Sequence, residues 1–200
     1  MPPTDGPVVQ TIGHSNHPFE TFAALLERAG IGAVLDVRSV PHSRRFRQFS
    51  RDALTDRLAA RDMGYLYLGR ELGARRDEPE AYVDGRADYD AIAGLPAFRL
   101  GLDRVLAEAS ARRVALMCAE REPLHCHRTI LVARHLIRRG AVVEHLLADG
   151  GREAHTETER RLVASTGAHA PDLLAAVDDL PADPLARAYT VQGRRLAYRR

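Results

Sequence analysis

Short apolar runs alternate with amphipathic segments along the first three quarters of the chain. The apolar, β-prone runs that we expect to be strands are residues 8–12, 33–37, 65–68, 114–118 and 141–147. The run 114–118 contains no polar residue, which is typical of a strand buried on both faces of a parallel sheet.

Apolar positions at helical spacing lie between these runs. They predict helices over residues 18–30 and 50–60, from residue 96 to about 109, and over 127–139. Pro18 suits a first helical position, Glu20 falls in the first turn, and Gly30 ends the first helix. Ser50 suits the N-cap of the second helix, and Gly140 ends the fourth.

Three other segments are less regular. Residues 69–90 hold three glycines, a proline and many charges, so we expect a long irregular loop, of the kind that serves as a lid or mobile segment. Beyond residue 150, the pattern predicts helices over 153–163 and 171–180, and a strand or docking tail over 188–198.

Strands that alternate with helices predict an α/β protein. We expect an open, mostly parallel five-stranded sheet of Rossmann-like, three-layer architecture, with helices on both faces. Residues 1–200 would form one domain, with its core in residues 8–150 and an extension over 151–200. For the five strands numbered along the chain, we expect the order 3-2-1-4-5.

Composition narrows the class of protein. Apolar residues make up 45% and charged residues 28% of the chain, as in a soluble globular protein. No run approaches the roughly 20 apolar residues of a membrane-spanning helix, so we expect no membrane partner. The N-terminal residues lack the basic and apolar regions of a secretory signal, which favours a cytoplasmic protein. Its two cysteines, Cys118 and Cys126, would there be free thiols, metal ligands or core residues.

The basic residues are clustered rather than in excess. The net charge is only +2, because 29 basic residues, all of them arginine, face 27 acidic ones. Residues 38–51, however, contain five arginines and His42 without any carboxylate. Phe46 and Phe49 lie among these arginines, a mixture found in proteins that bind single-stranded nucleic acid. A solvated helix entry also explains these residues, since the two phenylalanines could pack into the core.

Polar residues follow the predicted strands at their carboxyl ends, where open α/β sheets bind ligands. His14 and Ser15 follow the first strand, Asp36, Arg38 and Ser39 end the second, Tyr67 ends the third, and Cys118 and Glu120 follow the fourth. In the expected strand order, His14 and Cys118 would face each other across one crevice.

These residues also form a set of motifs. The motifs are residues 11–15 (TIGHS), 35–39 (LDVRS) with Pro41 and Ser43, 72–73 (LG), 116–120 (LMCAE), 126–128 (CHR), and Tyr189, Gln192 and 197–199 (AYR) near the end. In this combination the chain resembles the family called domain of unknown function 488, over about residues 8–150 and in its tail. The resemblance implies a Rossmann-like α/β fold and no settled reaction.

Cys118 has two interpretations. A cysteine at the end of a buried strand is often a small core residue. A cysteine between a parallel strand and a helix N-terminus is also how rhodanese-like and phosphatase-like proteins present a thiolate, and Asp36 and Arg38 resemble rhodanese sequences weakly. The phosphatase spacing fails, because the position six residues after Cys118 is Leu124.

Cys126, His127 and Arg128 begin the next predicted helix. There the pKa of a thiol should fall, and Arg128 could bind a phosphate or carboxylate with two hydrogen bonds. Alternatively, His127 and Arg128 only decorate the helix start. A metal is the third interpretation: Cys118 and Cys126 could form a soft site with His14 and with His125 or His127, although the interval between the cysteines is not a usual zinc spacing.

The sequence therefore predicts an enzyme-like protein, a Cys- or His-assisted transferase or hydrolase with no cofactor, that acts on an anionic small molecule or nucleotide. The residues that we assign to catalysis are Cys118, Cys126, His14, Glu120 and Asp36, the last orienting His14. Those assigned to substrate binding are Ser15, Arg38, Ser39, Ser43, Tyr67, His127 and Arg128. The alternatives are a nonenzymatic nucleic-acid or protein-interaction module that uses residues 44–51, and a metal-binding protein.

Overall fold

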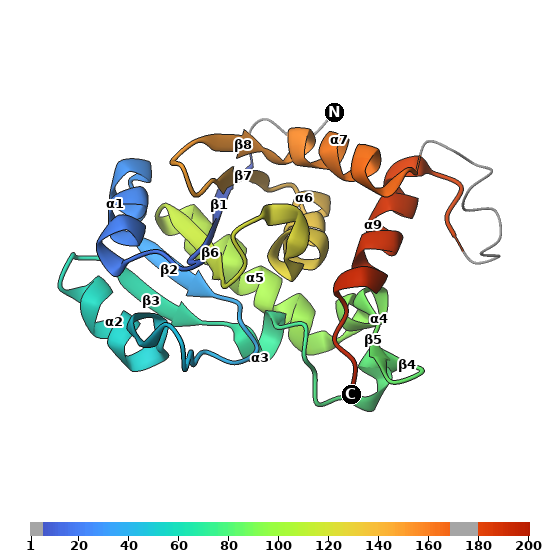
Figure 1. Cartoon of the computed structure of the whole chain (residues 1–200), viewed down its shortest axis with the longest axis horizontal. Coiled ribbons are helices and arrows are strands. Elements are labelled where there is room, and N and C mark those ends of the chain that lie inside the picture. The colour runs from blue at the N-terminus through green and yellow to red at the C-terminus, as the bar shows by residue number, and fades with distance from the viewer. Residues whose placement is uncertain (1–5, 169–179) are drawn as a thin grey trace.

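The central element of the protein is a sheet of six strands (Figure 1). The computed structural model describes residues 6–168 and 180–200. The strands of this sheet are β1 (Val8–Gly13), β2 (Ala33–Asp36), β3 (Gly64–Tyr67), β6 (Val114–Cys118), β7 (Val142–Leu146) and β8 (Arg152–Ala154). The fold class is therefore the predicted one, α/β with a mostly parallel sheet, and it carries one strand more than expected.

The lateral order of the strands is β3-β2-β6-β1-β7-β8. All neighbours are parallel except β8, which pairs antiparallel with β7. The predicted order was wrong: β6, the fourth predicted strand, lies between β2 and β1. All five residues of β6 are buried, as its unbroken apolar run predicts, but this pattern fits any interior position and cannot say which neighbours flank it.

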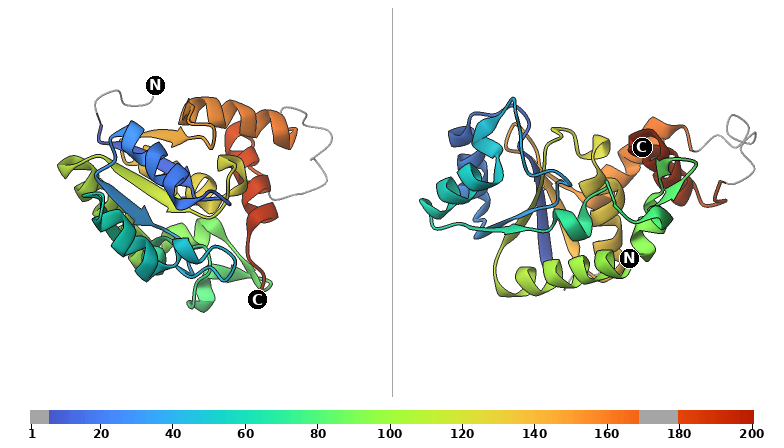
Figure 2. Two further views of the ribbon diagram at one scale, coloured as in Figure 1. Left: turned by 60° about the vertical axis from the view of Figure 1, so that its left-hand side comes forward. Right: turned by 90° about the horizontal axis from the view of Figure 1, so that it is seen from below.

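Helices cover both faces of the sheet (Figure 2). One face packs against α1 (Phe19–Ala29) and α2 (Arg51–Ala59), and the other against α5 (Pro96–Ala111) and α6 (Arg134–Arg138). Successive strand residues alternate between these faces: Met117 packs with α1 and α2, whereas Leu116 and Cys118 pack on the opposite side.

The first helix follows its sequence signals. α1 begins directly after Pro18 and buries one face, which includes Phe22 and Leu26. Gly30 adopts φ +68° and donates its N–H to the carbonyls of Leu26 and Glu27, the left-handed C-cap that glycine favours. Ser50 does occupy the N-cap position of α2, but its side chain makes no capping hydrogen bond there.

Residues 69–90 are more structured than predicted. They contain α3 (Gly69–Leu72), a 3₁₀ turn η2 (Pro79–Ala81) and a hairpin of β4 (Tyr82–Val83) and β5 (Arg86–Ala87), and α4 (Tyr89–Gly94) begins at their end. These elements are too short for a periodic pattern to reveal them. Tertiary contacts hold them instead, such as the hydrogen bond from Ala87 N–H to Tyr198 O at the far end of the chain.

The predicted helix over 127–139 is divided. It begins as a π-helical segment, η4 (Arg128–Ala133), after a 3₁₀ turn, η3 (Pro123–His125), and becomes α-helical in α6. A further 3₁₀ turn, η1 (Arg47–Phe49), precedes α2. π-helical segments are rare in proteins, and those that occur are often found at functional sites.

The C-terminal extension differs in part from the prediction. Residues 152–154 form the edge strand β8, and α7 (His155–Thr166) then follows, so the predicted helix start at 153 was too early. Of the two alternatives for residues 188–198, a strand or a docking tail, the strand is wrong, because α9 (Pro184–Leu196) is a helix whose apolar face packs on the core. The predicted helix over 171–180 lies outside the described residues, apart from Leu180.

No helix in the described part of the chain is both long and apolar enough to cross a membrane.

Candidate functional site

Two adjoining hollows lie at the carboxyl edge of the sheet. The first, of about 380 Å³, is lined by the turn after β1, the segment after β2 and the loop after β6. The second, of about 510 Å³, extends toward α4, η3 and the end of α9. The hollows share five lining residues: Arg38, Val40, His42, Ala119 and Glu120. They form one cleft with two lobes, at the edge where the polar motifs were predicted to gather.

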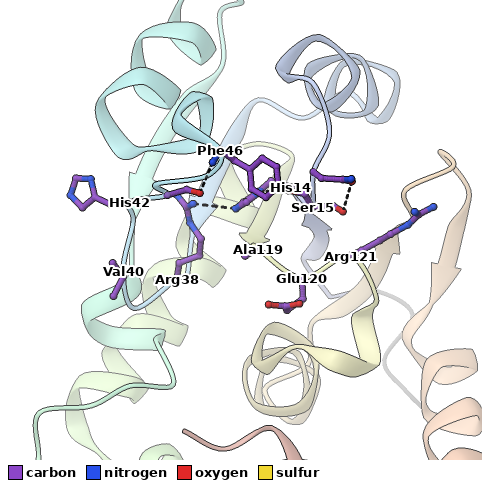
Figure 3. A pocket seen from close by; sticks show the side chains of 11 residues that line it. His14, Ser15, Arg38, Val40, His42, Phe46, Ala119, Glu120 and Arg121 are labelled. Carbon is purple, nitrogen blue, oxygen red and sulfur yellow. Dashed lines mark hydrogen bonds between the residues drawn. The ribbon is translucent and has the colours of Figure 1, made fainter.

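His14 forms the inner wall of the first hollow. Its side chain points toward Arg38, across from Glu120 on the loop after β6 (Figure 3). The ring stacks on Phe49, with centroids 4.3 Å apart. Nδ1 donates to Ser15 O at 2.8 Å, and Nε2 accepts from Arg38 Nη1 at 3.3 Å. Burial lowers the pKa of His14 to about 4, so the ring is neutral.

A buried ion pair of Asp36 and Arg38 lies behind this wall. Arg38 donates from Nε to Asp36 Oδ1 at 2.9 Å and from Nη2 to Oδ2 at 2.6 Å, and Nη2 also reaches Phe49 O. Tyr65 donates a further hydrogen bond to Asp36 Oδ2. Asp36 is fully buried. Because the guanidinium also donates hydrogen bonds to His14 and to Phe49 O, the Asp36–Arg38 ion pair connects β2, the turn after β1 and the segment before α2.

The floor of the second hollow holds a dithiol and an imidazole, which we call the Cys118–Cys126–His127 cluster. Sγ of Cys118 and Sγ of Cys126 lie 3.7 Å and 3.9 Å from Nδ1 of His127. All three atoms are within 4.8 Å of one another, so these side chains could hold a metal ion. On the other side of the ring, Nε2 donates to Val37 O at 2.9 Å, which fixes the ring and turns Nδ1 toward the sulfurs.

Electrostatics within the cluster separate the two thiols. Burial alone would raise the pKa of Cys126, but the hydrogen bond from Cys118, the charge of Arg128 and the hydrogen bond from His127 hold it well below its ordinary value. The hydrogen bond with Cys126 and burial raise the pKa of Cys118. The surroundings of the cluster therefore favour the thiolate form at Cys126 and the thiol form at Cys118.

Arg128 supports the cluster from within. It is fully buried and is not among the residues that line either hollow. Its guanidinium donates to the carbonyls of Glu120 at 2.5 Å and Arg121 at 3.3 Å, and its backbone N–H donates to Cys126 Sγ at 3.5 Å. Arg128 thus fixes the loop after β6, which both hollows share.

The structure brings most of the predicted site residues to the cleft. His14, Ser15, Arg38, Ser43 and Glu120 line the first hollow, and Arg38, Ser39, Cys118, Glu120, Cys126 and His127 line the second. Three predicted residues line neither of them. Asp36 and Arg128 lie behind the walls, and Tyr67 lines a separate hollow beside α2 and α3.

The prediction that His14 and Cys118 face each other is corrected. Their strands are neighbours, and His14 N–H donates to Cys118 O at 2.9 Å. The side chains nevertheless lie on opposite faces of the sheet, because His14 packs on Phe49 and Cys118 packs with the core on the α5 side. Adjacent strands bring backbones together, whereas strand alternation decides the face.

Some lining residues were not predicted. Arg75, Tyr89, Leu196 and Tyr198 line the second hollow, and Arg121 lines the first. Arg75 lies over the ring of Tyr198, 4.7 Å from its centroid. Only the pairing of the C-terminal residues with β5 brings these side chains together, and no local pattern signals it.

The fold and the cleft define a parallel α/β protein with a cysteine-containing site at the carboxyl edge of its sheet. The model of one protein family, described as a domain of unknown function, DUF488, matches residues 18–135. The chain belongs to this family, which agrees with the motifs along its strands. No curated protein and no solved structure matches the chain, and no finding supports the weaker resemblance to rhodanese-like proteins.

Proposed function

We propose that the protein is an enzyme that transfers or hydrolyses a group of a small anionic substrate bound in the cleft, with the Cys118–Cys126–His127 cluster as its chemical centre. The observation that carries the proposal is the position of this cluster on the floor of a hollow of about 510 Å³, a size that suits a nucleotide or a phosphorylated metabolite.

The charges of the lining favour an anion. Arg75 and Arg121 line the two lobes, and neither forms a salt bridge with another described residue. Glu120 is the one carboxylate among the lining residues of the two hollows. Arg38 is already neutralised by Asp36, so the attraction for an anion comes from Arg75 and Arg121.

The second lobe also offers aromatic surface. Tyr89 and Tyr198 line it together with Leu196. A ligand with a planar ring and a phosphate would contact the tyrosines with its ring and Arg75 with its phosphate. A nucleoside monophosphate has both parts, so it is the probe that we choose.

Calorimetric titration with adenosine 5′-monophosphate tests the proposal. We expect Arg75→Ala to weaken binding about 10- to 100-fold, the effect of losing a charge-assisted hydrogen bond. Arg138→Ala is the matched control, because Arg138 is exposed at the end of α6 and lines neither hollow. Equal affinities of wild type, Arg75→Ala and Arg138→Ala, or no binding by any of them, would contradict the proposal.

A second candidate function is single-stranded nucleic-acid binding along residues 44–51. The observation in its favour is that Arg44, Arg45 and Arg47 are exposed beside the first hollow, which Phe46 lines. If this function holds, the affinity for a single-stranded oligonucleotide falls steeply with salt, and neutralising the three arginines reduces that slope while Cys118→Ser leaves it unchanged. A salt slope unchanged by the triple variant would exclude this function.

A further inference from the structure

We propose that the Cys118–Cys126–His127 cluster is a zinc site with three protein ligands and a fourth position open to the second hollow. The proposal rests on the proposed function in that it names the cofactor of the same site. Two thiolates and one imidazole form a donor set that suits Zn²⁺ and is a poor match for Mg²⁺ or Ca²⁺.

The distances between the donor atoms fit a tetrahedral ion. Bonds of about 2.3 Å to sulfur and about 2.0–2.1 Å to nitrogen place sulfur and nitrogen about 3.6 Å apart across a tetrahedral centre. The two sulfur-to-nitrogen distances are 3.7 Å and 3.9 Å. Each sulfur therefore lies almost as far from Nδ1 of His127 as it would around a bound zinc ion.

Because the two sulfur-to-nitrogen distances are nearly equal, one ion between the three atoms could bind both sulfurs and the ring nitrogen.

The hydrogen bonds around the cluster orient the donors as in metal sites. Val37 O can only accept a hydrogen bond, so Nε2 of His127 carries a proton and Nδ1 is the ring atom that faces the sulfurs; a metal ion would take the place of any proton on Nδ1. The backbone N–H of Arg128 donates to the sulfur of Cys126. His127 and Cys126 thus each have a hydrogen bond that fixes the direction of the donor atom.

The fourth position would face the cleft. Among the described residues, no further histidine, cysteine or carboxylate joins the three ligand atoms that lie within 4.8 Å of one another. All three cluster residues line the second hollow, so the remaining position would take water or substrate, as in catalytic rather than structural zinc sites. A zinc ion there would lower the pKa of a bound water or polarise an anionic substrate.

Loading the metal-free, reduced full-length protein with Co²⁺ tests the site without any substrate. We expect visible absorption bands of tetrahedral cobalt and a thiolate-to-cobalt charge-transfer band, both removed by an equivalent of Zn²⁺. Cys118→Ser and Cys126→Ser should abolish the charge-transfer spectrum of the wild type. Octahedral cobalt bands without charge transfer would overturn the proposal.

The two histidines beside Cys126 provide a matched pair. His127→Ala should weaken Zn²⁺ binding by more than about 100-fold, because it removes one of the three ligands together with the hydrogen bond to Val37 O that orients it. His125→Ala should stay within about 2-fold of wild type, because His125 is exposed and lies outside the cluster. Equal losses in both variants, or none in either, would contradict the assignment.

A second titration distinguishes a failure of the metal site from a failure of the proposed function. Adenosine 5′-monophosphate is added to the metal-free and to the zinc-loaded protein, with Arg75→Ala beside each. Nucleotide binding that needs Arg75, together with failure of the cobalt and zinc experiments, overturns only the metal site. Tight zinc binding without nucleotide binding in either form supports the metal site and overturns the proposed substrate class.

Discussion

For single residues, the chemistry of the site depends on which buried side-chain atoms are already hydrogen-bonded to other parts of the protein. The sequence predicted that Cys118, Cys126 and His127 are functional, and the structure places them in one cluster. It also predicted that Arg128 binds substrate, but this guanidinium is engaged with the carbonyls of the loop after β6. A motif shows which side chains are available, whereas only the folded chain shows which of their atoms are already occupied.

The Asp36–Arg38 pair should be essential for stability. Asp36→Asn leaves a buried guanidinium without its counter-charge, so we expect the free energy of unfolding to fall by about 3–5 kcal/mol. Urea denaturation measures the loss. The control is Glu157→Gln, which removes the exposed pair with Arg160 and should cost less than about 1 kcal/mol. A loss of that small size in Asp36→Asn would mean that the pair does not brace the first hollow.

At the scale of elements, close packing at the end of β1 fixes the cleft. A Cβ on Gly13 would lie 1.9 Å from the carbonyl oxygen of Glu120, in the loop that both hollows share. This closeness follows from the parallel pairing of β1 with β6, in which Gly13 is opposite Cys118. Strands and long helices could be predicted because their apolar period is local. The order of the strands, the hairpin of β4 and β5, and the face of each site residue could not, because contacts distant in sequence decide them.

Gly13→Ala should therefore disturb both stability and the cleft. We expect the forced shift of the loop to lower the free energy of unfolding by about 1–3 kcal/mol and to weaken nucleotide binding. Thermal unfolding and calorimetry with adenosine 5′-monophosphate measure the two effects. Gly94→Ala is the control, since a Cβ there meets nothing within 4 Å, and it should leave both properties almost unchanged. Matching behaviour of the two variants would refute the packing argument.

At the scale of the whole molecule, a buried chain of hydrogen bonds joins the C-terminal helices to the sheet. Thr11 donates to His145 Nδ1 at 2.8 Å, His145 Nε2 to His155 Nδ1 at 3.0 Å, and His155 Nε2 to the Tyr189 hydroxyl at 2.7 Å, which donates to Glu159. With the donors in this direction, every member of the chain has a partner. The chain fixes α7 and α9, and with them the residues of α9 that reach the second hollow.

The same chain predicts how stability depends on pH. Burial, and then the nearby His155, hold the pKa of His145 well below its ordinary value, so the unfolded state binds a proton that the folded state excludes. The contribution of His145 is complete above about pH 6.5 and falls by up to about 1.4 kcal/mol per pH unit below it.

Urea denaturation at pH 7 and pH 5 measures this contribution. Wild type should be less stable at pH 5, and the difference between the two pH values should shrink in His145→Gln. His42→Gln, at an exposed position, should keep the difference of the wild type. A pH difference that is the same in all three proteins would contradict the assignment of a neutral, buried His145.

The central claim is that the cleft binds an anion directly beside the two thiols, and protection from alkylation tests it most directly. The rate of modification of Cys118 and of Cys126 by a neutral thiol reagent is measured by mass spectrometry on the metal-free protein, with and without adenosine 5′-monophosphate. We predict that the nucleotide slows modification of both cysteines in wild type and Arg138→Ala, and that Arg75→Ala loses this protection. Modification rates unchanged by the nucleotide in the wild type would contradict the account.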